Sequence, residues 1–184
     1  MKAWSGIVAI NVRVCRWCDI VFFSEFIKVT FVSNKRLLIL YHSQSGNTER
    51  MAQAVYAGAQ QEAEVDTRLM RAFDAGIQDL IGSDAVIIGT PENFGYMSGA
   101  IKDFFDRTYY PAQEHGLNLS YALFVSAGND GSGAVREIDR ILLGYPMKKV
   151  AEPMVVQGEV TDAVLVKCEE LGLNLATGLA FGIY

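Results

Sequence analysis

The chain has 184 residues, of which 51% are hydrophobic and 20% charged, and its formal net charge is −5. This length and hydrophobicity predict one domain with a buried core and exclude a disordered chain. The negative charge argues against a nucleic-acid-binding surface. The sequence has no apolar run of about 18 residues, so no transmembrane helix is expected. Three cysteines are too few for a disulfide framework and suit the cytoplasm.

Residues 1–33 differ in character from the rest of the chain. They carry four basic and two acidic side chains, whereas residues 34–184 carry 12 basic and 19 acidic ones, a net charge of −7. We therefore expect an N-terminal extension of unknown role at 1–33, followed by the domain at 34–184. The extension either packs on the domain or a partner, or is translated sequence upstream of the natural start. Its Cys15 and Cys18 have C-x-x-C spacing, but a second ligand pair and a thioredoxin-like context are missing, so we expect incidental cysteines and no metal site.

From residue 34 onward, short apolar runs alternate with longer amphipathic stretches. In chain order we expect a strand at 37–41, a helix at 49–63, a strand at 64–70, a short helix at 77–81, a strand at 85–89, a helix at 100–109, a strand at 121–126, a helix at 134–143, a strand at 149–157 and a helix at 162–180. Strict alternation of strand and helix predicts an α/β fold. It is a doubly wound, five-stranded parallel sheet with helices on both faces.

Three unusual loops follow strands of this sheet, at the edge where such folds bind ligands. The first is Ser43-Gln44-Ser45-Gly46-Asn47-Thr48. Its small polar side chains and its place at a helix N-terminus suit an anion, and the absence of lysine excludes a Walker A nucleotide loop. We expect a monophosphate there, the alternative being an ordinary helix cap.

The second and third loops add aromatic rings and glycines. Phe94 and Tyr96 stand in the second loop, 90–99, where they either flank a planar ligand or cap the core. The third loop, 126–133, has three glycines in eight residues, which alone indicates a plain loop. Because all three loops belong to one edge of the sheet, we interpret them together as one ligand site.

The loop sequences resemble those of flavodoxin-like flavoproteins over about residues 35–184. L-Y-H-S-Q-S-G-N-T-E at 40–49 resembles the flavin-phosphate loop, and F-V-S-A-G-N-D-G at 124–131 resembles the third flavin loop. G-T-P-E-N-F-G-Y-M-S-G at 89–99 is similar to the second flavin loop of NAD(P)H:quinone oxidoreductases of the tryptophan-repressor-binding-protein type. The resemblance implies the flavodoxin-like fold and an FMN cofactor.

The resemblance also implies a role for individual residues. The phosphate-binding residues would be Ser43, Ser45, Gly46, Asn47 and Thr48, with Gln44 between the phosphate and the ribityl chain. The residues along the isoalloxazine ring would be Pro91, Glu92, Asn93, Phe94 and Gly95, and those closing its far edge Ser126, Gly128, Asn129 and Gly131. Tyr96 and His115 are candidates for the substrate pocket. We assign no side chain as a catalytic acid or base.

The implied activity is that of an FMN-dependent NAD(P)H oxidoreductase that passes two electrons to a quinone or similar small acceptor. The alternative is a flavodoxin-type electron carrier, but such carriers are strongly acidic, and −7 on this domain is modest. A flavin-binding regulatory protein is a third hypothesis. Members of this kind are often homo-oligomers, dimers or tetramers. A serine hydrolase is excluded because the first loop lacks the glycines that flank a nucleophile elbow.

Overall fold

The computed structural model describes residues 35–145 and 147–184. The predicted N-terminal extension, with Cys15 and Cys18, lies outside these residues. Within them, no helix combines the length and the apolar character that crossing a bilayer requires.

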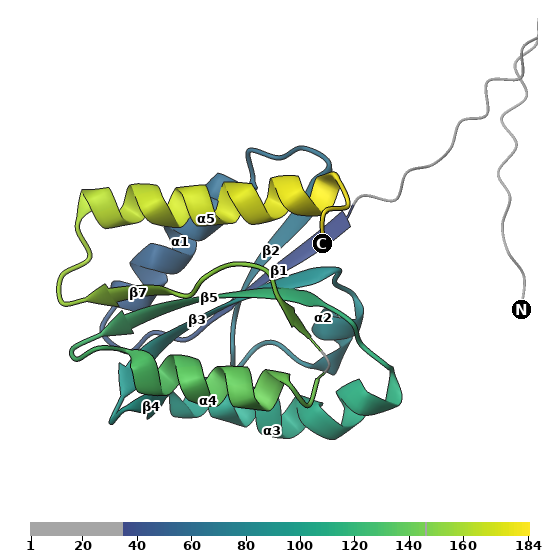
Figure 1. The fold of residues 1–184 in the computed structure, drawn as a ribbon, viewed down its shortest axis with the longest axis horizontal. Coiled ribbons are helices and arrows are strands. Elements are labelled where there is room, and N and C mark those ends of the chain that lie inside the picture. Colours follow the sequence, from purple (N-terminus) through teal and green to yellow (C-terminus); the bar gives the residue numbers. More distant parts are fainter. Residues whose placement is uncertain (1–34, 146) are drawn as a thin grey trace, which may run out of the picture. The chain divides into compact units, whose positions relative to one another are not determined.

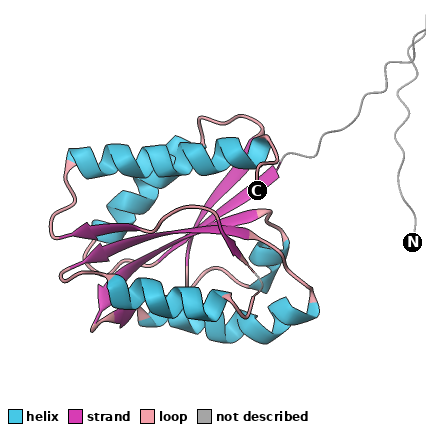
Figure 2. Ribbon diagram, viewed as in Figure 1, coloured by secondary structure: helices cyan, strands magenta, loops and turns pink. Residues whose placement is uncertain are grey.

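A parallel sheet forms the centre of the described part (Figures 1 and 2). Its strands are β1 (Lys35–Tyr41), β2 (Val65–Arg71), β3 (Ala85–Asn93), β5 (Ser120–Ala127), β6 (Lys148–Lys149) and β7 (Met154–Gln157). The strand order is β2-β1-β3-β5-β6, with β7 also pairing with β5. The inner strands are runs of buried apolar residues because helices cover both faces of the sheet. The predicted doubly wound α/β fold is confirmed.

The helices form a layer on each face of the sheet (Figure 1). One layer holds α1 (Asn47–Ala59) and α5 (Asp162–Ala180), and the other holds α2 (Ile77–Ile81), α3 (Gly99–Glu114) and α4 (Ser132–Leu142). Neighbouring residues of β1 point to opposite layers, Ile39 toward α1 and α5 and Leu40 toward α2, α3 and α4. Both side chains are fully buried, so each layer has its own apolar core.

The second predicted loop is a β-hairpin. Strand β3 continues to Asn93 and pairs antiparallel with β4 (Tyr96–Met97). Phe94 (φ 55°) and Gly95 (φ 70°) form the turn, and two positive φ angles in a row are typical of a type I′ hairpin turn. Glycine suits this conformation, whereas an aromatic residue does so rarely, so the sequence signal for the turn was weak.

The last predicted strand, 149–157, is wrong as a continuous strand. In this segment only the short strands β6 and β7 pair with β5, and Pro153, which has no N–H to donate, lies between them. Lys149 pairs with Tyr121 and Met154 pairs with Phe124. These pairs are five residues apart on the edge segment but three apart on β5, so the edge segment bulges by two residues.

Three helices also differ from the predicted bounds, and one of them is α4, which spans 132–142 instead of 134–143. Helix α1 spans 47–59 instead of 49–63, and α3 continues to Glu114 instead of ending at 109. Pro111 therefore lies within α3, next to the buried Ala112 that holds this last turn on the core.

Candidate functional site

The first loop ends in a left-handed turn at the start of α1. Gly46 has φ +94° and is the N-cap of the helix, where no side chain makes a capping hydrogen bond. Its N–H donates to Ser43 Oγ at 3.1 Å, and its carbonyl accepts from the N–H of Arg50 at 2.9 Å. The first N–H groups of an α-helix have no partner within the helix, and the helix dipole makes them attractive to an anion. A Cβ at Gly46 would meet nothing within 4 Å, so a ligand can approach this turn.

The first and third loops are joined by a buried hydrogen bond. Thr48 Oγ1 lies 2.7 Å from Ser126 Oγ, and the two residues are 1% and 8% exposed. Both were predicted to bind the cofactor from sequence positions 78 residues apart. The bond fixes the start of α1 relative to the end of β5.

The second and third loops are joined by a hydrogen bond and a close approach. Glu92 Oε2 accepts the N–H of Gly131 at 3.2 Å. A Cβ added to Gly133, in the first turn of α4, would lie 1.9 Å from the carbonyl oxygen of Gly95. The hairpin therefore rests directly on the N-terminus of α4, and only a glycine at 133 allows this contact.

Two buried hydroxyl groups hold the base of the hairpin. Thr90 Oγ1 accepts the N–H of Ser98 at 3.0 Å, and it donates to either the carbonyl oxygen of Pro91 at 2.9 Å or Ser98 Oγ at 3.3 Å. Thr90 and Ser98 are both 0% exposed. Sequence reasoning missed these two residues and Gly133 as positioning groups. The only signals were hydroxyl residues at the two ends of the loop and a third glycine in the cluster at 127–133.

The tip of the hairpin presents an aromatic ring to solvent. The Phe94 side chain is fully exposed, whereas Tyr96 is half-buried against the core beneath the hairpin. Asn93 pairs with Tyr96 across the two strands. An exposed ring beside the other two loops suits contact with a planar ligand.

In the third loop, Gly131 has φ +69° and is the N-cap of α4. The Asp130 carboxylate accepts hydrogen bonds from the N–H and the hydroxyl of Ser132, at 3.0 and 2.9 Å, and these bonds lower the pKa of Asp130. A Cβ at Gly128 would meet nothing within 4 Å, so the backbone there is open to a ligand.

The structure does not bring His115 to the three loops. It follows the last residue of α3, which starts beside the hairpin and leads to the amino end of β5, so His115 lies at the opposite edge of the sheet.

The other histidine of the described residues, His42, directly precedes the first loop. Its ring lies edge-on to Phe73, with centroids 5.9 Å apart, and burial followed by the charge of Arg71 lowers its pKa, so the ring is neutral at pH 7.

The donor set of the first loop fits a phosphate monoester. The hollow of about 700 Å³ that Ser45, Gly46 and Asn47 also line runs between α1 and α5 past Glu49 and Glu169, so the phosphate is assigned to the turn itself and not to this hollow. The loop 43–48 offers hydroxyl, amide and backbone N–H groups and contains no lysine. Among residues 35–145 and 147–184, no group of three or more His, Cys, Asp and Glu side chains lies close enough to hold a metal ion. The residues present therefore fit the phosphate of FMN.

Two kinds of curated relative resemble this chain. A flavodoxin from Aquifex aeolicus (strain VF5) is 34% identical over 71 residues, which are 39% of this chain and 38% of that protein. NAD(P)H dehydrogenases (quinone) from Acidithiobacillus ferrooxidans (strain ATCC 53993 / BNL-5-31) and Paracoccus denitrificans (strain Pd 1222) are 33% and 30% identical. Those alignments cover 53% and 67% of this chain, and 60% and 71% of the two relatives. The chain thus spans less than two thirds of the first two relatives.

Solved structures show the same fold. A flavodoxin from the domain Archaea superposes with a TM-score of 0.68 at 24% identity, covering 78% of this chain and 98% of the other. The flavodoxin, WrbA-like protein from Agrobacterium tumefaciens gives a TM-score of 0.65 at 21% identity, covering 80% and 98%. The model of the flavodoxin family matches residues 39–171, which include all three loops. The chain therefore belongs to the flavodoxin family.

Proposed function

We propose that the chain binds FMN at the three loops and transfers electrons from NAD(P)H to a quinone or a similar small acceptor. The observation that carries the proposal is the joining of the loops into one unit by the Thr48–Ser126 and Glu92–Gly131 hydrogen bonds. When bound, FMN supplies the two-electron chemistry, and the protein supplies binding, orientation and electrostatics.

In this proposal the three loops have separate tasks. The first loop, 43–48, holds the phosphate at the N-terminus of α1. The hairpin residues 91–95 and the third loop, 126–131, line the isoalloxazine ring from either side. Tyr96, half-buried beneath the hairpin tip, contributes to the acceptor pocket. His115 is left out because it lies at the other edge of the sheet.

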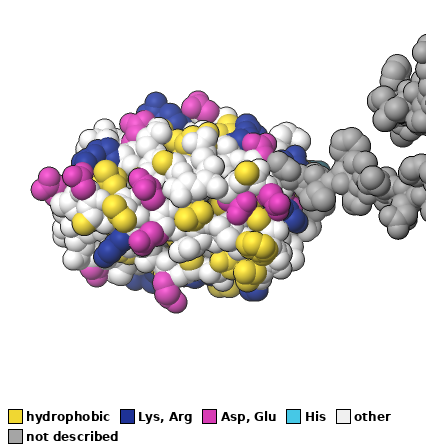
Figure 3. All heavy atoms as spheres, turned by 90° about the horizontal axis from the view of Figure 1, so that it is seen from above, with side chains coloured by type: hydrophobic (Ala, Val, Ile, Leu, Met, Phe, Trp, Pro, Cys, Tyr) yellow, Lys and Arg dark blue, Asp and Glu magenta, His cyan; other side chains and the backbone are white. Residues whose placement is uncertain are grey.

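Two observations favour an enzyme over an electron carrier. Two relatives are named NAD(P)H dehydrogenase (quinone), although a third is named flavodoxin. Carriers use a strong acidic field to steer their partners, whereas acidic and basic side chains are interspersed on the face shown in Figure 3. We therefore propose the electron carrier only as the second candidate.

We also propose that the protein works in the cytoplasm as a homo-oligomer, either a dimer or a tetramer. Few cysteines suit a reducing compartment. The oligomer is the form that the resemblance to the quinone oxidoreductases implies.

An absorbance spectrum of the purified full chain, followed by anaerobic addition of NADPH or NADH, tests the function. We expect a flavin spectrum that bleaches on addition of the nucleotide and returns when a soluble quinone is added. A colourless protein that cannot be loaded with FMN would refute the proposed cofactor. A flavin spectrum that neither nucleotide bleaches, but that a flavodoxin reductase does, would establish the electron carrier instead.

A further inference from the structure

The N-terminus of α1 carries N–H groups that the fold leaves for an anion. Gly46 is the N-cap and has no side-chain capping bond, and the N–H groups of Asn47, Thr48 and Glu49 donate to no acceptor within residues 35–145 and 147–184. These N–H groups and the positive end of the helix dipole attract negative charge. An anionic side chain of the protein itself can therefore compete with the phosphate of a cofactor.

Glu49 is the anionic side chain placed to compete. It stands three residues after the N-cap Gly46, the position from which the glutamate of a capping box reaches back to the N-cap N–H. Here the Gly46 N–H donates to Ser43 Oγ at 3.1 Å instead. Glu49 Oε1 accepts a hydrogen bond from Tyr41 Oη at 3.0 Å. The carboxylate is therefore held by the tyrosine and does not cap the helix.

Tyr41 is a donor that the core keeps in place. It is the last residue of β1, it is 4% exposed, and its side chain packs in the apolar core beneath α1 and α5. Burial, followed by the hydrogen bond to Glu49, raises the pKa of Tyr41, so the hydroxyl stays protonated well above neutral pH. The bond to the carboxylate thus has a fixed and permanent donor.

The other charges near this bond oppose one another. Arg50 and Glu169 line the hollow beside Glu49, and both are exposed. Arg71 and Asp74, at and after the end of β2, act on the tyrosine hydroxyl with opposite effects. Neither pair supplies a net charge that would hold the carboxylate. Without the tyrosine hydroxyl, the first N–H groups of α1 are therefore its strongest attraction.

We propose that Tyr41 is a positioning residue for the phosphate: its hydroxyl holds the Glu49 carboxylate aside and so keeps the N-terminus of α1 open to the phosphate of FMN. This inference deepens the proposed function and rests on the first loop holding that phosphate. It gives two residues outside the predicted cofactor set the task of excluding a competing anion. The pair should therefore affect the binding of FMN but not of riboflavin, which lacks the phosphate.

Fluorescence titration of the full-length apoprotein with FMN and with riboflavin tests the proposal. Tyr41→Phe fills the same space and removes only the hydroxyl, so Glu49 becomes free to cap the helix. We expect the FMN dissociation constant to rise about twofold to thirtyfold, the range that one N-cap hydrogen bond sets, and that of riboflavin to stay unchanged. Adding Glu49→Ala to Tyr41→Phe should restore FMN binding, because the competing carboxylate is then gone.

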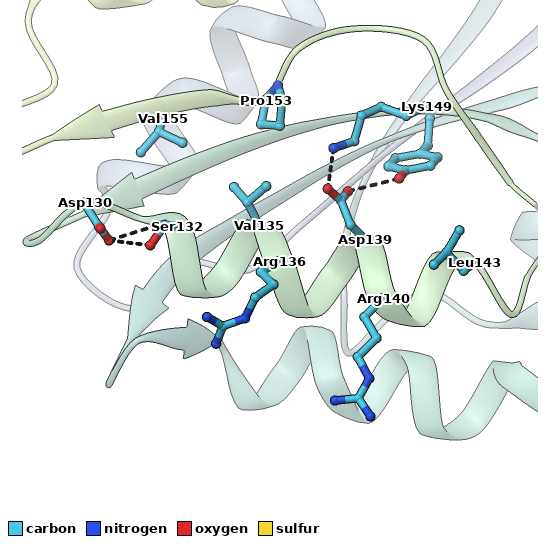
Figure 4. Close-up of a pocket in the computed structure, with 11 residues that line it drawn as sticks. Asp130, Ser132, Val135, Arg136, Asp139, Arg140, Leu143, Lys149, Pro153 and Val155 are labelled. Atoms are coloured by element: carbon cyan, nitrogen blue, oxygen red, sulfur yellow. Dashed lines mark hydrogen bonds and ion pairs between the residues drawn. The ribbon is translucent and has the colours of Figure 1, made fainter.

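Tyr121→Phe is the matched control. Tyr121 is 5% exposed, and its hydroxyl also donates to a carboxylate, that of Asp139, at 2.9 Å; Asp139 forms an ion pair with Lys149 as well (Figure 4). This bond lies near the amino end of β5, and Tyr121 packs on the opposite face of the sheet from Tyr41. The control should leave both dissociation constants unchanged, even if it lowers the free energy of unfolding.

Glu49→Ala alone is an independent check that leaves the core intact. With Tyr41 in place the carboxylate is already held aside, so this variant should leave the FMN dissociation constant unchanged. An FMN affinity more than about tenfold higher would show that the carboxylate competes despite Tyr41, and would overturn the inference.

Three results with Tyr41→Phe would also overturn it: an unchanged FMN affinity, an equal loss for FMN and riboflavin, and a loss that Glu49→Ala does not restore. A selective loss of FMN binding in Tyr121→Phe would do the same. All of these outcomes leave the proposed cofactor intact. A wild type that binds no FMN would instead overturn the proposed function, and the inference with it.

Discussion

The hydrogen bond between Thr48 and Ser126 makes the flavin-site proposal testable by one substitution. Thr48→Val keeps nearly the shape of the side chain and removes only the hydroxyl that lies 2.7 Å from Ser126 Oγ. Thr48 is 1% exposed and Ser126 is 8% exposed, so water cannot readily replace the lost partner. The substitution therefore leaves a buried hydroxyl unpaired at the junction of the first and third loops.

The size of the effect follows from that burial. Leaving a buried hydroxyl unpaired costs about 1–3 kcal/mol, part of which weakens folding and part of which weakens the binding of a ligand that needs both loops in place. If the phosphate also uses the Thr48 hydroxyl, the binding loss is at the upper end. Because only part of this cost falls on binding, we expect the FMN dissociation constant to rise by up to about 150-fold.

A matched variant separates the site from the fold. Thr108 is also 1% exposed, and its hydroxyl bonds to the Phe104 carbonyl at 2.7 Å and to Tyr145 Oη at 2.8 Å, on the layer of α3 and α4. Thr108→Val should therefore lower the free energy of unfolding without changing FMN affinity. The measurements are fluorescence titration of the apoprotein with FMN and urea unfolding of each variant. Equal FMN affinity in the two variants would refute the role of Thr48.

Three further predictions address the hairpin and the core. Gly133→Ala should weaken FMN binding by about 1–3 kcal/mol, because the new Cβ would lie 1.9 Å from the Gly95 carbonyl oxygen and must displace the hairpin. Gly99→Ala is the control: a Cβ there meets open space, so this substitution should leave FMN binding unchanged. Titration of both variants with FMN checks the difference. Phe94→Ala should raise the FMN dissociation constant about twofold to tenfold, because the ring would no longer contact the cofactor. The melting temperature should not change, since the ring is fully exposed. An unchanged dissociation constant would contradict the proposed contact. Burial, followed by the charge of Glu169, raises the pKa of Cys168 to about 11, so the folded chain keeps a proton that the unfolded chain releases above about pH 9. The free energy of unfolding should thus fall between pH 9 and 11, and in Cys168→Ala it should fall less steeply with pH, as measured by urea unfolding. The same pH dependence in both proteins would refute the contribution of Cys168.

The adjacency of the three loops could be predicted from the sequence because it depends on the alternation of strands and helices. Apolar runs such as Leu37–Tyr41 are too short for helices and must be strands, and parallel strands bring their carboxyl ends to one edge. The loops after β1, β3 and β5 therefore had to be neighbours. The hydrogen bond between Thr48 and Ser126 joins two of these loops, as this rule leads one to expect.

The errors arise where tertiary contacts outweigh local preference. The turn at Phe94 puts a bulky residue at positive φ, a conformation that local propensity disfavours, because β3 and β4 pair on either side of it and Gly95 rests on Gly133. Lys149–Gln157 has the composition of one strand, yet Pro153 interrupts its pairing with β5. No spacing along the chain indicates which edge of the sheet the end of a long helix reaches, so the sequence could not show that His115 lies away from the three loops.

Helix α4 supports the candidate site at two points. Its N-terminus carries the N–H of Gly131 that Glu92 accepts, and its first turn supports the hairpin through Gly133. The Glu92 carboxylate lies beside the positive end of the helix dipole, so part of its negative charge is offset where the ring of the proposed cofactor would lie. The orientation of one helix thus contributes to the electrostatics of the candidate site and supports its hairpin.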